Sequence, residues 1–164
     1  AKEDSLTGLP NRRALEQWLQ SALSRATVAQ PTTLLLIDVD HFKQVNDRFG
    51  HAIGDRALHQ LAGLMRQNCR YADFPARYGG EEFVLALPQT DLATGIDVAQ
   101  RFSHSVSAFY WEGIQPGLAV TISVGVASTA ELTTPCCSEG LIAAADNRLY
   151  VAKNDGRNRV VSAG

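Results

Sequence analysis

This chain of 164 residues has no large excess of positive or negative charge, few cysteines and no long apolar runs. A net charge of −2 and an isoelectric point of about 6.1 create no global field that would attract a nucleic-acid polymer or an anionic membrane. The longest apolar runs, such as 34–37, are far too short to cross a bilayer. We therefore expect no nucleic-acid partner and no membrane contact for this segment, and any anionic ligand must be held by local groups.

Cysteine occurs three times, at Cys69, Cys136 and Cys137. An odd number with two adjacent residues suits reduced thiols better than a disulfide framework, and no signal-peptide pattern opens the chain. Hydrophobic residues make up 45% of the sequence and charged residues 20%, which is ordinary for a globular protein. We expect a single domain over 1–164, located in the cytoplasm. We also expect it to be one part of a longer signalling protein, and a membrane anchor elsewhere in that protein is compatible with this location.

The spacing of apolar residues predicts an alternation of helices and strands. Helices are expected over 15–23, 58–70, 92–109 and 141–153. Strands are expected over 32–39, buried on both faces, over 76–78 and 82–87, paired as a hairpin, over 120–126, buried on one face, and over 160–161. A polar loop is expected over 40–50. Without the first and last helices the order is β-α-β-β-α-β, a split arrangement typical of an α+β fold whose antiparallel sheet is surrounded by helices.

The most informative stretch is 77–83, Arg-Tyr-Gly-Gly-Glu-Glu-Phe. Gly79 and Gly80 lie between two runs with β propensity, which indicates a tight hairpin turn. Glycines allow a bulky polyanion to lie against the backbone, and an adjacent carboxylate such as Glu81 or Glu82 can hold a divalent cation. An ordinary hairpin with solvated glutamates explains this stretch equally well when it is taken alone.

Two further carboxylates, Asp38 and Asp40, end the strand 32–39, and we expect their side chains on opposite faces. In a split sheet this strand can pair beside the hairpin, which would bring Asp38 near Glu81. Two close carboxylates repel unless a cation lies between them, so Mg²⁺ bridging to substrate phosphates is the natural ligand. The alternative is an aspartate that caps the following loop.

Several motifs, in this order and spacing, resemble those of the GGDEF domain of bacterial diguanylate cyclases. They occupy 4–13, 36–43, 46–47, 49–51, 54–55, 77–83 and 152–158. The resemblance covers nearly the whole chain. It implies a palm or nucleotidyl-cyclase type of α+β fold, and a signalling reaction in which two GTP molecules form cyclic di-GMP and release two pyrophosphates.

The resemblance also assigns the reaction centre. Asp38 and Glu81, with the backbone carbonyl of Val39, would hold Mg²⁺, or Mn²⁺ in its place. Glu81 or Glu82 would take the proton of the attacking 3′-hydroxyl, and the sequence leaves open which of the two does so. The third position of the signature is glutamate here instead of aspartate, which keeps the carboxylate.

By the same resemblance, a second group of residues would bind GTP. The phosphates would contact the backbone around His41, Phe42 and Lys43, the glycines Gly79 and Gly80, and the side chains of Lys153 and Arg157. Asn46 and Asp55 would read guanine, with His51 beside them. Ordinary alternatives are basic residues favoured near a helix C-terminus, Asp55 as a helix N-cap, and a structural histidine.

Arg70 and Asp73 match the RxxD inhibitory site of the family, and Arg101 matches its secondary arginine. Arginine can donate to guanine O6 and N7 while aspartate accepts from another edge of the base. Asp97 stands where some members carry a second arginine, which leaves the strength of product binding open. A surface ion pair is the alternative.

We thus expect a diguanylate cyclase domain that acts as a homodimer, because each site binds one GTP, and that is inhibited by cyclic di-GMP. One alternative is a module that senses cyclic di-GMP or GTP without turnover, although no expected carboxylate or glycine is missing. Another is a palm-type cyclase or polymerase for a different nucleotide, which Asn46 and Asp55 disfavour if that base is adenine.

Overall fold

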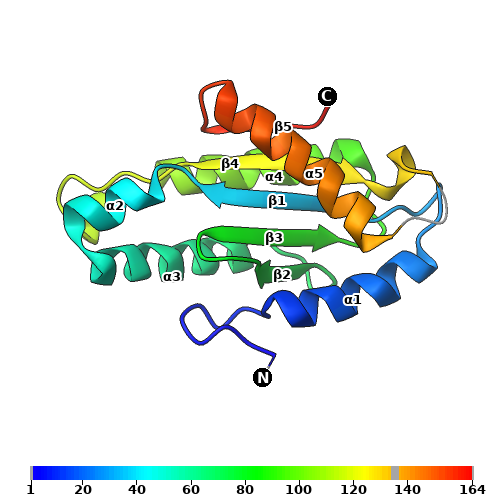
Figure 1. Cartoon of the computed structure of the whole chain (residues 1–164), viewed down its shortest axis with the longest axis horizontal. Coiled ribbons are helices and arrows are strands. Elements are labelled where there is room, and N and C mark those ends of the chain that lie inside the picture. Colours follow the sequence, from blue (N-terminus) through cyan, green and yellow to red (C-terminus); the bar gives the residue numbers. More distant parts are fainter. Residues whose placement is uncertain (1, 134–136, 164) are drawn as a thin grey trace.

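The computed structural model describes residues 2–133 and 137–163 and shows one sheet with helices on both of its faces (Figure 1). The helices are α1 (Arg12–Arg25), α2 (Phe42–Phe49), α3 (His51–Gln67), α4 (Leu92–Ala108) and α5 (Ser138–Asn154), with short 3₁₀ turns η1 (Trp111–Gly113) and η2 (Thr129–Glu131). The strands are β1 (Thr33–Val39), β2 (Phe74–Arg77), β3 (Glu82–Leu87), β4 (Ile122–Ser128) and β5 (Arg159–Val161).

The strand order in the sheet is β2-β3-β1-β4-β5. The central strand β1 pairs antiparallel with β3 and with β4, and β2 and β3 form the expected hairpin. The short strand β5 joins the edge of the sheet parallel to β4, so the sheet is mixed. The split β-α-β-β-α-β arrangement is confirmed, with one parallel strand added.

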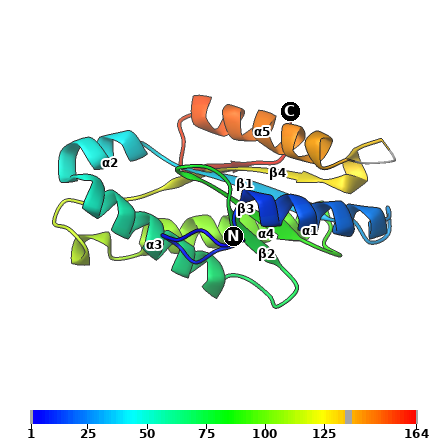
Figure 2. The ribbon, with the colours of Figure 1, turned by 60° about the horizontal axis from the view of Figure 1, so that its bottom comes forward.

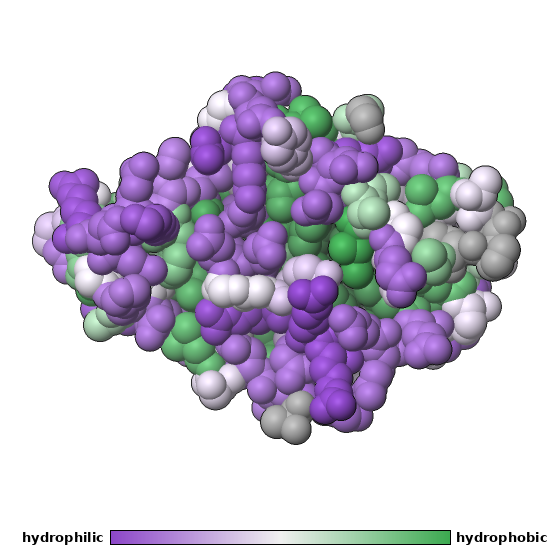
Figure 3. Space-filling model, viewed as in Figure 1, coloured by the Kyte–Doolittle hydropathy of each residue, from purple (hydrophilic) through white to green (hydrophobic). Residues whose placement is uncertain are grey.

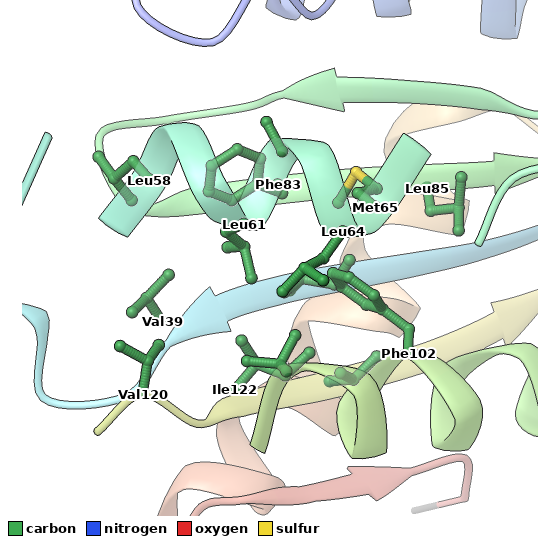
Figure 4. Close-up of a cluster of buried hydrophobic side chains, with 14 of the residues drawn as sticks. Val39, Leu58, Leu61, Leu64, Met65, Phe83, Leu85, Phe102, Val120 and Ile122 are labelled. Atoms are coloured by element: carbon green, nitrogen blue, oxygen red, sulfur yellow. The ribbon is translucent and has the colours of Figure 1, made fainter. Parts of the chain in front are cut away.

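Two hydrophobic clusters hold the helices against the sheet. On one face, α3 and α4 pack side chains such as Leu61, Met65 and Phe102 against β3, β1 and β4 (Figure 4). On the other face, α1 and α5 pack residues such as Leu19 and Leu149 against the same strands. Figure 2 shows α5 on one side of the sheet and α3 and α4 on the other. Since burying one such side chain contributes about 1.5–3 kcal/mol, both clusters stabilise the position of every strand.

Two local predictions were wrong because of this packing. The predicted polar loop over 40–50 contains helix α2, since Phe42 and Val45, three residues apart, are both buried in the first cluster. Strand β4 is buried along its whole length instead of on one face, because α5 covers the face that the polar and small residues of β4 share.

Two remaining features concern membranes and thiols. In the described part of the chain, no helix has both the length and the apolar character needed to cross a bilayer. Cys69 is a free cysteine, and burial raises the pKa of its thiol to about 11, which keeps the thiol protonated and unreactive. Cys136 lies outside the described residues.

Candidate functional site

The end of β1 lies beside the start of β3, where the glycine pair makes its turn. Asp38 is directly opposite Glu82 in the strand register, and the Val39 N–H donates to the Glu81 carbonyl over 3.2 Å. The predicted approach of Asp38 to the Gly-Gly-Glu-Glu stretch is confirmed. The carboxylates of Asp38, Glu81 and Glu82, which belong to two separate motifs, thus lie together where β1 ends and β3 begins.

Asp38 and Asp40 lie on the same face of the sheet, so the prediction of opposite faces was wrong. Ser123 pairs with Asp38 across β1 and β4, and its Oγ donates to Asp40 Oδ1 over 2.6 Å. The physical reason is the two-residue period of a strand, which returns residue i+2 to the side of residue i. The two aspartates nevertheless have different environments.

The Asp38 carboxylate is buried and only half satisfied. Its Oδ2 forms an ion pair with the Lys153 ammonium, and within the described residues no hydrogen bond reaches Oδ1. An unpartnered buried carboxylate oxygen is costly in a folded protein. The free oxygen therefore indicates that Asp38 binds a ligand that is not part of the protein chain.

The neighbouring glutamates Glu81 and Glu82 both have raised pKa values. Burial raises the pKa of the Glu81 carboxyl, and the adjacent Asp38 charge raises it further. Burial likewise raises the pKa of Glu82, followed in effect by the charge of Asp38. A cation would relieve this repulsion, and carboxylate and carbonyl oxygens are the ligands that Mg²⁺ prefers. The residues present therefore fit the expected magnesium ion.

Within residues 2–133 and 137–163, no three acidic, histidine or cysteine side chains are arranged so that they could hold a metal ion by themselves. A cation at Asp38 and Glu81 would thus need oxygens from other sources, such as the Val39 carbonyl and substrate phosphates. Mg²⁺ bound through one or two carboxylates and substrate phosphates has this kind of incomplete protein shell.

The basic residues come from the C-terminal end of α5 and the turn that follows it. Lys153 lies in the last turn of α5 and contacts Asp38. Arg157 is two residues beyond the helix cap, in a left-handed backbone conformation with φ of 64°. The sequence predicted that Lys153 binds phosphates and did not predict this contact with Asp38, 115 residues away, which only the fold brings about. Binding of phosphates by Lys153 and Arg157 stays a prediction.

The backbone at the start of α2 follows directly from the end of β1. His41 is left-handed, with φ of 55°, and Phe42 begins the helix. The first N–H groups of a helix have no partner within it, so those of Phe42 and Lys43 are available to an anion. The Lys43 side chain points to solvent and pairs with Asp47 over 3.0 Å, which leaves the backbone of Lys43 as the part suited to phosphate.

The two residues expected to read guanine lie at the junction of α2 and α3. A Cβ added at Gly54 would lie 1.8 Å from Asn46 Oδ1, so the Asn46 side chain rests directly on the backbone of α3. Asp55 is exposed next to Gly54 and lines a cavity of about 370 Å³. The alternative that Asp55 caps α3 is wrong, because the helix begins at His51 and Gly50 is its N-cap. His51 is exposed at the same junction.

A larger groove of about 1130 Å³ runs between α1 and α5 and reaches Glu82. Arg12 and Tyr78 form part of its wall, with the Arg12 guanidinium 4.2 Å from the centre of the Tyr78 ring. Figure 3 shows apolar side chains exposed among polar ones on the face that carries these helices. One wall of the carboxylate site is therefore open to this groove.

Arg77 and Asp4 belong to the site but received no role from the sequence. The Arg77 guanidinium donates to the carbonyls of Gly79 and Gly80, over 3.2 and 2.7 Å, and to Asp4 Oδ1 over 3.1 Å. Burial alone would raise the pKa of Asp4, but hydrogen bonds from Thr7 and Arg77 lower it overall. Arg77 thereby ties the glycine turn to the N-terminal segment, and its place inside the motif 77–83 was the available signal.

At the other end of the hairpin, Arg70 and Asp73 form a compact unit. Asp73 is buried and accepts from the Arg70 backbone N–H over 2.7 Å and from its guanidinium over 3.1 Å. The guanidinium also donates to Thr90 Oγ1 over 2.7 Å and remains 59% exposed. Arg101 is exposed on α4. The structure thus joins Arg70 to Asp73 and shows no bond from Arg101 to either among the described contacts.

Comparison with known proteins agrees with this geometry. A profile of the family described as "Diguanylate cyclase, GGDEF domain" matches residues 1–159. The response regulator PleD of Caulobacter vibrioides is 47% identical over 98% of this chain, and diguanylate cyclase DgcP of Pseudomonas aeruginosa is 41% identical over 98%. These matches cover only 36% and 24% of the two relatives, so the chain spans well under half of their length.

Solved structures show the same fold. Diguanylate cyclase SiaD of Pseudomonas aeruginosa, crystallised with its activator SiaC, is 40% identical with a TM-score of 0.90, and the match covers 99% of this chain and 62% of that one. The coiled coil and GGDEF domain of DgcB from Caulobacter crescentus, in complex with c-di-GMP, is 30% identical with a TM-score of 0.89, over 99% and 85% of the two chains.

Proposed function

Because this chain belongs to the family of diguanylate cyclase GGDEF domains, we propose that it condenses two GTP molecules into cyclic di-GMP and releases two pyrophosphates. We take it to be one catalytic domain of a longer signalling protein. The observation that carries the proposal is the half-satisfied Asp38 carboxylate beside Glu81, Glu82 and Lys153. A purely structural site would not retain this concentration of charge.

Asp38, Glu81 and the Val39 carbonyl would hold Mg²⁺, or Mn²⁺ in its place. When bound, the ion supplies neutralisation of charge at the α-phosphate and lowers the pKa of the attacking hydroxyl. The remaining chemistry falls to side chains of this chain. The 3′-oxygen of one GTP forms a bond to the α-phosphorus of the other, and the bond from that phosphorus to pyrophosphate breaks.

A carboxylate accepts the proton of the 3′-hydroxyl. Glu81 and Glu82 both suit this role, because burial and the Asp38 charge raise the pKa of each carboxyl and so make the ionised form a stronger base. Lys153 and Arg157 would donate charge-assisted hydrogen bonds to the departing phosphates. The backbone of Phe42 and Lys43 would hold their terminal end, and Gly79 and Gly80 would let them approach the hairpin.

Base selection falls to Asn46 and Asp55. A carboxylate accepts from guanine N1–H and the exocyclic amine, whereas adenine presents an acceptor at N1, so Asp55 favours GTP over ATP. His51 lies at the same helix junction and would complete the contact. The proposed use of GTP is also the reason to place the domain in the cytoplasm.

Regulation by product is part of the same proposal. Crystal structures of the GGDEF domain of DgcB contain c-di-GMP, and this chain carries Arg70 and Asp73 as a preformed pair. We expect these two residues, with Arg101, to bind the guanine edges of cyclic di-GMP and to reduce turnover.

The direct test is to incubate the purified chain with GTP and Mg²⁺ and to separate the nucleotides by chromatography. We expect cyclic di-GMP and pyrophosphate in a ratio of one to two, and no cyclic product from ATP. Binding of GTP without any cyclic product at high protein concentration would contradict the proposal and favour a sensing module.

A further inference from the structure

Asp40 is a buried carboxylate that the proposed reaction does not use. It follows β1, is 7% exposed, and its two oxygens accept three hydrogen bonds. Ser123 Oγ donates to Oδ1 over 2.6 Å, and Thr121 Oγ1 donates to Oδ2 over 2.7 Å. The third donor is the backbone N–H of Asn158, 2.9 Å from Oδ2. A buried charge is tolerated when it is satisfied in this way.

The environment of Asp40 differs from that of Asp38, two residues earlier. Asp38 keeps one oxygen without a hydrogen bond among the described residues, as a position awaiting a ligand does. Both oxygens of Asp40 are already occupied by protein donors. Asp40 is therefore suited to hold another part of the chain in place.

The part that Asp40 holds is the turn after α5, which carries Arg157. Three successive residues of this turn, Gly156, Arg157 and Asn158, have positive φ angles of 122°, 64° and 47°. Left-handed backbone at residues other than glycine is unfavourable and persists only where the surroundings enforce it. The bond from the Asn158 N–H to Asp40 joins residues 118 positions apart and supplies such a restraint directly beside Arg157.

We propose that Asp40 is a positioning residue for Arg157: its carboxylate anchors the turn 156–158 to the end of β1 and thereby directs the Arg157 guanidinium toward the polyphosphate of GTP. This inference rests on the proposed function. It assigns to Asp40 no contact with substrate or metal and no proton transfer.

The test compares GTP binding with and without Arg157. Asp40→Asn keeps the size of the side chain but replaces one of two acceptor oxygens by a donor, in a site where three donors converge. The readout is the Kd of a fluorescent GTP analogue, measured at protein concentrations where no turnover is detected. We expect Asp40→Asn to raise this Kd by roughly tenfold or more, the loss typical of a charge-assisted bond.

In an Arg157→Ala background the same Asp40→Asn change should alter the Kd less than about twofold, because its effect passes through Arg157. An equal fold-change in both backgrounds would overturn the proposal. KM for GTP should follow the Kd in the parent background, while kcat changes little. A fall in kcat alone, with unchanged Kd, would also overturn it.

Two further measurements separate anchoring from loss of the fold. Hydrogen exchange at the Asn158 amide should accelerate in Asp40→Asn, and unchanged exchange would show that no anchor exists. Ser123→Ala removes one donor, leaves the carboxylate in place, and should raise the Kd in the same direction by a smaller factor. As a control, Glu131→Gln removes a carboxylate that pairs with Arg148 at the opposite end of β4 and should lower the melting temperature without changing the Kd.

Failure of this inference and failure of the proposed function are distinguishable. Binding of the analogue without formation of cyclic di-GMP would contradict the proposed function and leave the coupling between Asp40 and Arg157 measurable. Formation of cyclic di-GMP without that coupling would contradict only the inference. No binding by the parent chain would overturn both.

Discussion

At the scale of single residues, the environments of four carboxylates are the best guide to the function of this protein. Asp38, Glu81 and Glu82 are partly or fully buried beside one another, and burial, followed by the charge of Asp38, raises the pKa of both glutamates. Such a cluster costs folding stability and is typical of a site that binds a cation or moves a proton. Asp40 differs, because both of its carboxylate oxygens accept hydrogen bonds from the protein. Chemically identical side chains two residues apart thus have different environments, which is why we propose different roles for them.

The first prediction concerns Glu81. Glu81→Gln keeps the size of the side chain and removes its charge, so both a proposed metal ligand and a candidate base are lost. We expect the rate of cyclic di-GMP formation to fall about 100-fold or more, with an unchanged melting temperature or a higher one. Turnover within a few-fold of the parent would rule out the assignment of Glu81.

The second prediction concerns pH and Glu82. The ordinary pKa of this carboxyl is 4.5, and burial followed by the Asp38 charge raises it in the folded state. Between these two values the folded protein binds more protons than the unfolded chain, so stability falls as pH rises through this window. In metal-free buffer, Glu82→Gln should therefore raise the urea midpoint of unfolding at pH 7 and should have little effect below pH 4.5.

The exposed Glu3 offers a matched control for this measurement. Glu3→Gln removes an equal charge without removing the crowding at the site, and its urea midpoint should stay close to that of the parent at both pH values. A Glu82→Gln midpoint that is unchanged at pH 7, or that rises equally at low pH, would contradict the electrostatic explanation.

Among the elements, α5 determines how the basic residues meet the carboxylates. It crosses β4 at Gly125, where an added Cβ would lie 2.0 Å from the Ala145 carbonyl oxygen and 2.5 Å from the Leu149 nitrogen. Both atoms belong to the helix backbone, which cannot move without moving the whole helix. The absence of a side chain at Gly125 therefore sets the height of α5 above the sheet, and with it the position of Lys153.

The third prediction follows from this close packing. Gly125→Ala should lower the free energy of unfolding by about 1–3 kcal/mol or more, as overpacking does, and should weaken GTP binding because Lys153 is displaced. Gly63→Ala is the matched control: nothing lies within 4 Å of the added Cβ on α3, so it should stabilise the protein by about 0.5–1 kcal/mol. Equal effects of the two changes, measured by urea unfolding, would refute the role of Gly125.

At the scale of the whole molecule, the two proposed sites lie at opposite ends of strand β3. The carboxylates lie where β3 begins, opposite Asp38, while Arg70 and Asp73 precede β2, whose first residue pairs with Ala86 near the end of β3. A strand of this length spans about 17–20 Å, so product bound at Arg70 would not occupy the metal position. Inhibition by cyclic di-GMP should therefore be non-competitive with GTP.

The fourth prediction tests this second end. Arg70→Ala should weaken binding of cyclic di-GMP about 5- to 150-fold, since one bidentate arginine contact to guanine contributes about 1–3 kcal/mol. Turnover at low product concentration should persist, because Arg70 lies away from the reacting phosphates. Titration calorimetry of the parent and the variant decides between this outcome and equal affinities, which would reduce Arg70 and Asp73 to a surface ion pair.

The fifth prediction concerns assembly. If the proposed function holds, one domain binds one GTP, whereas the product contains two guanosine phosphates related by two-fold symmetry, so two domains would have to face each other during the reaction. Specific activity should therefore rise with the concentration of the isolated chain and reach a plateau when dimers predominate. A specific activity that is constant over a hundredfold dilution would exclude a weakly associating catalytic dimer.

The sequence by itself determined the elements whose signal is local. Apolar periodicity predicted α1, β1, the β2–β3 hairpin and α4 close to their observed bounds, because these patterns repeat within one helix or strand. The resemblance to the motifs of the GGDEF family identified Asp38, Glu81 and Lys153 as candidates for the reaction site and Arg70 as a candidate for the inhibitory site. Local patterns were insufficient for α2, whose eight residues include only a few apolar side chains.

Only the tertiary structure decided which of these groups meet. Strand pairing placed Asp38 opposite Glu82, and the seat of α5 on Gly125 brought Lys153 to Asp38. The anchoring of the turn 156–158 by Asp40 depends on a bond between residues 118 positions apart. Contacts of this kind leave no periodic trace in the sequence, because they depend on sheet order and helix packing, which are set by burial of the whole chain at once.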